Sequence, residues 1–410
     1  MELSFANGAL LLLLVAAVVA IVTQRLSMPY SVGLVVAGIV LAFLPVALRI
    51  SLTRELIFDA LLPPLLFEAA FGLRWNQLRR ELPVVLTFAS VGVVLSGAVT
   101  AAGMYYLAGW EWHGALVFGS LIAATDPVSV IAIFREAKLQ GRLRLLIEAE
   151  SLFNDGTAAV AFGVALLLSS GQSVTILDLA ANLLTTVGGG LVCGAAVGGA
   201  ALLLVGRTRD PLIELTFTTV AAYGSFLLAE QFHFSGVFAT IVAGLIIGNW
   251  GTLGVLSDPG REAVRAFWKY AAFAANSLIF LLIGMHEATQ NFRGVWLGST
   301  VAILFVLLGR AIAIYALSPL FSRSNLRVTV HHQHALFWGG LRGALALALA
   351  LGLPSHIPRR GEIITVSFAV VAFSVFVQSL TMRPLLRAMG EIPASEHSAG
   401  FHEPRTTRGD

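Results

Sequence analysis

The stretch ESLFNDG (Glu150–Gly156) lies in an apolar run, residues 148–170, that is long enough to cross a lipid bilayer. A second carboxylate, in the stretch TDP (Thr125–Pro127), lies in the apolar run 113–134. An ionised carboxylate near the centre of a membrane helix costs about 2.5–3.5 kcal/mol on insertion scales. Because chains retain such groups where they line a path for ions or protons, the two aspartates predict transport across a membrane.

The composition of the chain is that of a membrane protein. Of its 410 residues, 57% are hydrophobic and 12% are charged, whereas about a quarter of the residues are charged in a typical soluble domain. The net charge of +3 does not indicate nucleic-acid binding, because the basic residues lie in short loops between apolar runs. The single cysteine, Cys193, excludes an intrachain disulfide framework and a cysteine-based metal site.

Thirteen apolar runs approach the length of about 20 residues that a bilayer-spanning helix requires. They cover residues 5–24, 29–47, 55–72, 83–107, 113–134, 148–170, 177–205, 210–230, 234–250, 264–284, 294–318, 332–353 and 362–388. The sequence therefore predicts an all-α polytopic membrane protein with 13 transmembrane helices, which we number in chain order.

The arginines and lysines are distributed unequally between the two sides of this topology. Nineteen of them follow odd-numbered helices, helix 13 included, and five follow even-numbered helices. Cytoplasmic loops are enriched in these residues, so we expect a protein of the cell (inner) membrane with its C-terminus in the cytoplasm and its N-terminus outside. The remaining two, Arg310 and Arg342, lie inside helices 11 and 12.

Thirteen helices also allow an internal symmetry. Helices 1–6 and 8–13 can be two repeats joined by helix 7 as a linker. Equivalent helices are then seven positions apart, which is an odd number, so they cross the membrane in opposite directions, as in inverted-repeat transporters. Helices 5 and 12 are then equivalent, and both contain residues that interrupt helices: TDP in helix 5 and GGLRG (Gly339–Gly343) in helix 12. We expect both helices to be unwound and to cross near the membrane midplane.

The residues at the predicted break in helix 5 suit a hard cation. Pro127 has no backbone N–H, so it should free the carbonyl oxygen of Ala123 and open the helix around Thr125 and Asp126. Carboxylate, hydroxyl and carbonyl oxygens are the ligands that such cations prefer. The break therefore predicts a cation site.

Helix 6 adds a second set of polar groups. Ser151 and Asp155 are four residues apart and share a helix face, and Asn154, beside Asp155, can donate or accept a hydrogen bond. Two carboxylates that lie close together in a partly desolvated cavity repel each other. We therefore expect one of the two aspartates, Asp126 or Asp155, to hold either a proton or a cation.

Glu150 needs a partner of opposite charge within the membrane, because an unpaired buried charge is strongly destabilising. We expect this partner to be Arg342, on the second interrupted helix. Three partners remain open for Arg310 in helix 11: Glu150, another carboxylate, or the free carbonyl groups of an interrupted helix.

Taken together, these motifs resemble the monovalent cation/proton antiporters, in the branch of NhaP and the sodium/hydrogen exchangers. The similarity extends from Leu62 to Leu386. It rests on the stretches FE (Phe67–Glu68), ATDPV (Ala124–Val128), ESLFNDG (Glu150–Gly156), FSGV (Phe234–Val237), FLLIG (Phe280–Gly284) and GLRGA (Gly340–Ala344).

The resemblance implies a core domain of helices 4–6 and 11–13 that moves, in the manner of an elevator, against a domain that forms a homodimer. The corresponding ranges are 1–81 and 207–285 for the dimerisation domain, 82–172 and 286–388 for the core domain, 173–206 for linker helix 7, and 389–410 for a short cytoplasmic tail.

The resemblance also implies roles for individual residues. Asp155 is the carrier of the cation and the proton. Asn154 precedes it where the electrogenic branch of the family has a second aspartate, and Glu150 pairs with Arg342. The other residues expected near the cation are Asp126, Thr125, Ser151 and Glu68.

We therefore expect an electroneutral antiporter, not an enzyme, that exchanges one Na⁺ or Li⁺ for one proton by alternating access and contributes to pH homeostasis. No cofactor is expected, and the expected partners are monovalent cations, protons, the lipid bilayer and a second copy of the chain. A K⁺-selective antiporter of the same fold is the nearest alternative. A gated cation channel and a non-transporting membrane sensor are alternatives of another class.

Overall fold

The computed structural model describes residues 2–3, 5–26, 28–44, 47–48, 52–126, 128–136, 141–170, 175–251, 254–290 and 292–392. Within these residues the regular structure is helical, apart from two two-residue strands, β1 (Glu2–Leu3) and β2 (Ala47–Leu48), which pair in parallel. The predicted all-α class is confirmed. Pro127 and residues 393–410, most of the predicted tail, lie outside the described residues.

Helices in the first half of the chain follow the predicted apolar runs. Their bounds are α1 (Phe5–Leu26), α2 (Tyr30–Ala42), η1 (Leu56–Leu61), α3 (Leu62–Gly72), α4 (Trp75–Leu86), η2 (Thr87–Gly92), α5 (Val93–Tyr106), α6 (Trp112–Leu121), α7 (Val128–Glu136), α8 (Arg142–Ser169) and α9 (Ile176–Val205). The helical stretch containing the run 83–107 begins earlier, at Trp75, because α4 includes charged residues that a count of apolar residues leaves out.

Helices in the second half do the same. Their bounds are α10 (Pro211–Gln231), α11 (Gly236–Trp250), α12 (Asp258–Glu287), η4 (Phe292–Gly294), α13 (Trp296–Leu317), η5 (Ser318–Phe321), α14 (Val330–Trp338), α15 (Ala344–Leu351), α16 (Arg360–Phe373), η6 (Ser374–Ser379) and α17 (Leu380–Ala388).

The starts of three long helices are fixed by side chains that accept hydrogen bonds from free backbone N–H groups. Thr175 forms a capping box with Asp178 at the start of α9. Asp210 accepts a hydrogen bond from the backbone N–H of Leu212 at the start of α10. Ser257 does the same for Gly260 in α12. These caps define where the three helices begin.

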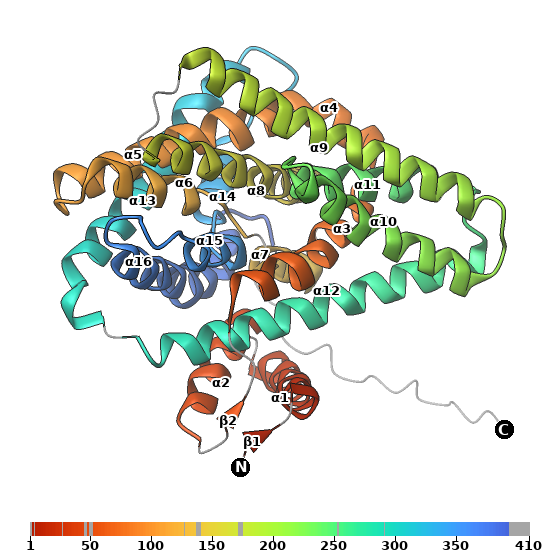
Figure 1. Cartoon of the computed structure of the whole chain (residues 1–410), viewed down its shortest axis with the longest axis horizontal. Coiled ribbons are helices and arrows are strands. Elements are labelled where there is room, and N and C mark those ends of the chain that lie inside the picture. The colour runs from red at the N-terminus through yellow and green to blue at the C-terminus, as the bar shows by residue number, and fades with distance from the viewer. Residues whose placement is uncertain are drawn as a thin grey trace, which may run out of the picture.

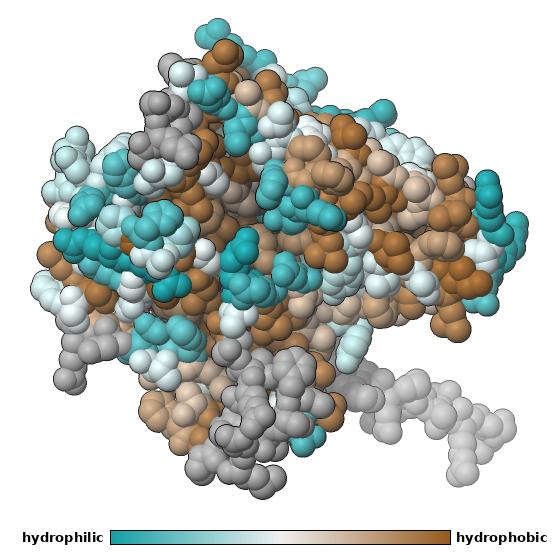
Figure 2. Space-filling view, viewed as in Figure 1, coloured by the Kyte–Doolittle hydropathy of each residue, from teal (hydrophilic) through white to brown (hydrophobic). Residues whose placement is uncertain are grey.

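The surface of the molecule is apolar over wide areas. Among the described residues, eight helical spans are long and apolar enough to cross a membrane, and α2 and α11 are shorter apolar helices. Large apolar side chains point outward, among them Leu14 on α1 and Leu184 and Leu203 on α9. Figure 2 shows hydrophobic side chains gathered on the exterior. Soluble proteins rarely expose apolar patches of this extent, so the chain is a multi-pass membrane protein, as predicted.

The helices pack in two groups (Figure 1). In one group α11 packs between α9 and α3, α10 contacts α9, α11 and α12, and α12 lies along α2. In the other group α5 contacts α6 and α13, α6 contacts α8, and α16 contacts α13 and α15. Helix α8 touches members of both groups, since it also contacts α3, α9 and α11. A side chain on α8 can therefore face the boundary between the groups.

Two of the predicted membrane helices are interrupted. Helix α6 ends at Leu121 and α7 begins at Val128, so residues 122–126 are not helical. Helix α14 ends at Trp338 and α15 begins at Ala344, so residues 339–343 are not helical either. The breaks lie where TDP and GGLRG predict them, and they provide free backbone groups inside the protein.

Candidate functional site

The two non-helical segments contact each other directly. The backbone N–H of Asp126 donates a hydrogen bond to the carbonyl oxygen of Leu341, with an N···O distance of 2.7 Å. The guanidinium of Arg342, 2% exposed, donates through Nη1 to the carbonyl oxygens of Ala123 and Ala124, at 2.9 and 3.1 Å. The carbonyl of Ala123, which the sequence predicts to be freed, is therefore bonded across the crossing by Arg342, as buried backbone groups require.

The predicted pair of Glu150 with Arg342 is wrong, because Glu150 is paired with Arg310. The Nη1 and Nη2 atoms of Arg310 lie 2.7 and 2.9 Å from the two carboxylate oxygens of Glu150, a bidentate arrangement. Arg310 also donates to the carbonyl oxygen of Leu336 near the end of α14. One guanidinium on α13 thus neutralises a carboxylate on α8 and bonds an interrupted helix, while Arg342 is occupied by the carbonyls at the end of α6.

A chain of hydrogen bonds joins this ion pair to the break after α6. Asn154 donates through Nδ2 to Glu150 Oε1, at 3.2 Å, and to Thr125 Oγ1, at 3.1 Å. The Thr125 hydroxyl donates to Ser151 Oγ at 3.3 Å, and the Ser151 hydroxyl donates to the carbonyl oxygen of Thr125. The predicted residues of α8 and of the break are therefore brought together, and Asn154 connects them.

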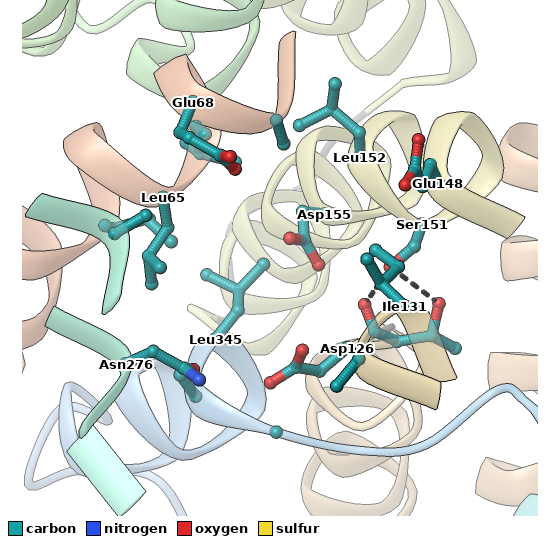
Figure 3. Close-up of a pocket in the computed structure, with 18 of the residues that line it drawn as sticks. Leu65, Glu68, Asp126, Ile131, Glu148, Ser151, Leu152, Asp155, Asn276 and Leu345 are labelled. Carbon is teal, nitrogen blue, oxygen red and sulfur yellow. Dashed lines mark hydrogen bonds between the residues drawn. The ribbon is translucent and has the colours of Figure 1, made fainter. Parts of the chain in front are cut away.

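A cavity of about 350 Å³ opens beside this network (Figure 3). Asp155 on α8 and Asp126 in the break point their carboxylates into it, and Glu68 on α3 lies across from them. The two aspartates interact electrostatically. Within the described part of the chain, the Asp155 carboxylate has no hydrogen-bond partner. A carboxylate of this kind can exchange a proton for a small cation.

Gly343 allows the second interrupted helix to approach Asp126. A Cβ atom at position 343 would lie 2.2 Å from Asp126 Oδ2, a distance that no side chain tolerates without displacing the carboxylate. Residue 343 also lines the cavity, together with Ala344 and Leu345 at the start of α15. Gly343 therefore allows the two non-helical segments to approach each other closely.

Among the described residues that line the cavity, five polar ones were not predicted as site residues: Tyr30, Arg144, Glu148, Lys269 and Asn276. Asn276 on α12 faces the predicted residues from the opposite wall (Figure 3). It is an amide within the apolar run 264–284, which a search for charged residues passes over. Glu148 is seven residues before Asp155 and three before Ser151, so the helical spacing of α8 places all three on one side. This spacing is the feature of the sequence from which Glu148 could have been predicted as a site residue.

Comparison with known proteins places this architecture in one family. Residues 11–388 match the family model described as the transmembrane sodium/hydrogen exchanger. The chain is 39% identical to the Na⁺/H⁺ antiporter ApNhaP of Aphanothece halophytica over 369 residues, which cover 89% of this chain and 70% of that protein. It is 33% identical to the Na⁺/H⁺ antiporter NhaH of Halobacillus dabanensis, with 93% of this chain and 97% of that protein covered.

The fold is also similar to a solved structure. The sodium proton antiporter MjNhaP1 from Methanocaldococcus jannaschii at pH 8 superimposes with a TM-score of 0.73 at 19% sequence identity. The match covers 93% of this chain and 96% of that one. The arrangement of helices is therefore shared over most of the length of both chains.

Proposed function

This chain belongs to the sodium/hydrogen exchanger family, whose members are transporters and not enzymes, and we propose that it is an electroneutral antiporter exchanging one Na⁺ or Li⁺ for one proton. The single observation that carries the proposal is the position of the Asp155 carboxylate. Its carboxylate faces a cavity next to Asp126 and makes no hydrogen bond within the described residues. A free carboxylate beside a second one is suited to bind one cation or one proton, but not both at once.

We propose roles for the surrounding groups on the same basis. Asp126, Thr125 and Ser151 supply oxygen atoms near Asp155, which suit a hard cation. Glu68 on the opposite wall adds a carboxylate to the path toward Asp155. The framework residues are Asn154, Glu150, Arg310 and Arg342, which fix α8 and the two interrupted helices relative to one another.

The proposal includes the finer architecture. We propose thirteen membrane helices in two inverted six-helix repeats, a homodimer, and movement of a core domain (82–172 and 286–388) against the remainder (1–81 and 207–285), with 173–206 as linker. The contacts of the helices in two groups support the division into domains. The pair of interrupted helices, one in each half of the chain, supports the repeats. The distribution of arginine and lysine supports a cytoplasmic C-terminus.

Competition between the cation and protons for Asp155 is the direct test of the proposed exchange. In proteoliposomes with a preset pH gradient, Na⁺ or Li⁺ should discharge the gradient, and choline should not. Protons occupy Asp155 more fully as the pH falls, so the apparent Na⁺ affinity should weaken by about tenfold per pH unit in the range where protonation dominates. An affinity that stays constant between pH 6 and 8.5 would contradict a shared site.

The same assay separates the alternatives. Discharge by K⁺ but not by Na⁺ would identify a K⁺-selective antiporter. Cation flux without proton movement in the opposite direction would identify a channel, and an absence of both would identify a membrane sensor.

The charges at the crossing predict electroneutral exchange. Glu150 and Arg310 neutralise each other, and the proposed exchange replaces one proton at Asp155 by one monovalent cation. The site therefore carries the same charge in both directions, so the full cycle moves no net charge, whereas each net charge would experience about 2.3 kcal/mol per 100 mV.

This prediction is measured in proteoliposomes whose membrane potential is clamped with K⁺ and valinomycin. The Na⁺ gradient at zero flux should equal the proton gradient at every imposed potential. A Na⁺ ratio that shifts with potential would show net charge movement and would overturn the one-to-one stoichiometry, while leaving antiport itself in place.

A further inference from the structure

A second cavity of about 450 Å³ adjoins the first. It is formed where the turn between α3 and α4 meets the start of α8. The two cavities share three lining residues, Gly72, Arg144 and Glu148. These residues therefore mark the boundary between the site of Asp155 and the space beyond it.

The two cavities differ in charge. Among its described lining residues, the first has more carboxylates than basic groups: Glu68, Asp126, Glu148 and Asp155 against Arg144 and Lys269. The second has the opposite balance: Arg74, Arg80, Arg142 and Arg144 against Glu81 and Glu148. A cation that passes from the second cavity to the first moves from a basic into an acidic environment. Glu148 and Arg144 lie where the balance changes.

Glu148 and Arg144 are bound to each other at this boundary. Arg144 Nε lies 2.8 Å from Glu148 Oε1, and the two side chains are 28% and 21% exposed. The neighbouring Arg142 is held differently, because it binds both oxygens of Glu81 and also the carbonyl oxygens of Leu326 and Arg327. Arg142 is fixed by four hydrogen bonds, whereas a partly exposed ion pair between residues four apart on a helix is weak and exchanges readily.

The position of Glu148 on α8 connects it to Asp155. Because Glu148 and Asp155 are seven positions apart, the two residues lie about 10 Å apart along the helix axis. Both line the first cavity, with Ser151 between them (Figure 3). A cation that leaves Glu148 in the direction of the acidic cavity therefore approaches Asp155.

We propose that the Arg144–Glu148 ion pair is a charge gate for the transported cation, in which the cation replaces the Arg144 guanidinium at Glu148 before it reaches Asp155. Glu148 attracts the cation, and Arg144 competes with it for the same carboxylate. This inference rests on the proposed antiport, and it adds a step that sets the apparent cation affinity on the side of the second cavity.

The gate predicts opposite effects for its two members. Glu148→Gln should raise the apparent KM for Na⁺ about two- to fivefold, and Arg144→Gln should lower it by a similar factor, as the strength of a partly exposed ion pair implies. Maximal rates should stay close to wild type, because Asp155 and Asp126 are untouched. Since Arg144 acts through Glu148, the double variant should have the KM of Glu148→Gln.

The experiment is Na⁺-dependent proton movement in everted and right-side-out membrane vesicles, so that each face receives Na⁺ separately. The KM shifts should occur on one face only, the face of the second cavity. A matched control is Asp258→Asn, which breaks the pair with Arg261 at the start of α12, away from both cavities; its KM should be that of wild type.

The possible outcomes distinguish a failure of the proposed gate from a failure of the proposed antiport. Shifts in the same direction for both single variants, or KM values equal to wild type in an active exchanger, would overturn the gate, because a purely structural pair behaves in that way. Wild-type vesicles without any Na⁺-dependent proton movement would instead refute the proposed antiport, on which the gate depends.

Discussion

Asp155→Asn is expected to reduce Na⁺-dependent proton movement to the level of vesicles without protein. The amide has nearly the shape of the carboxylate, so the cavity and the packing of α8 should persist. It neither releases a proton in the physiological pH range nor carries the charge that balances a cation. Since Asp155 has no hydrogen-bond partner among the described residues, the substitution breaks no bond of the framework, and the loss should be specific to transport.

The measurement is the initial rate of proton movement in proteoliposomes, together with thermal unfolding of the purified variant in detergent. Asp258→Asn is a control of identical chemistry at an exposed position, since the Asp258 side chain is 92% exposed, and it should transport as wild type does. A rate for Asp155→Asn within threefold of wild type, at unchanged thermal stability, would remove Asp155 from the role of carrier.

The interrupted helices could be predicted from the sequence because their causes are local. A proline without an N–H in TDP and three glycines in GGLRG both disfavour a continuous helix, whatever surrounds them. The same holds for the polar face of α8, because the spacing of Ser151 and Asp155 follows from helix geometry alone. These two local features of the sequence predict most of the candidate site.

The partner of Glu150 could not be predicted in the same way. Arg310 and Arg342 both lie in apolar runs, and a single sequence gives no distance between helices. The two guanidinium groups are distinguished by the backbone: the break after α6 exposes the carbonyls of Ala123 and Ala124, and Arg342 is bonded to them. Asn276 was missed for a related reason, because an uncharged amide in an apolar run gives no signal until α12 is placed against the cavity.

Arg310→Met is expected to destabilise the protein by about 3–5 kcal/mol, because it leaves the carboxylate of Glu150 buried without its partner. The side chains of Arg310 and Glu150 are 6% and 3% exposed, so water cannot replace the lost bonds. The Leu336 carbonyl near the end of α14 would lose its donor as well. The expected effect is a large drop in the midpoint of thermal unfolding, in the absence and presence of Na⁺.

A second substitution tests whether the cost comes from the unpaired charge. In Arg310→Met/Glu150→Gln the buried carboxylate is gone, while the Gln side chain still offers an oxygen to Asn154. The double variant should therefore be more stable than Arg310→Met alone, which is a favourable coupling of the two changes. Arg342→Met provides the matched comparison, because its guanidinium bonds backbone carbonyls and not Glu150. Adding Glu150→Gln to Arg342→Met should bring no recovery and should destabilise further, since Arg310 then loses its carboxylate. Recovery in the Arg342 background and none in the Arg310 background would show that Glu150 is paired with Arg342 after all.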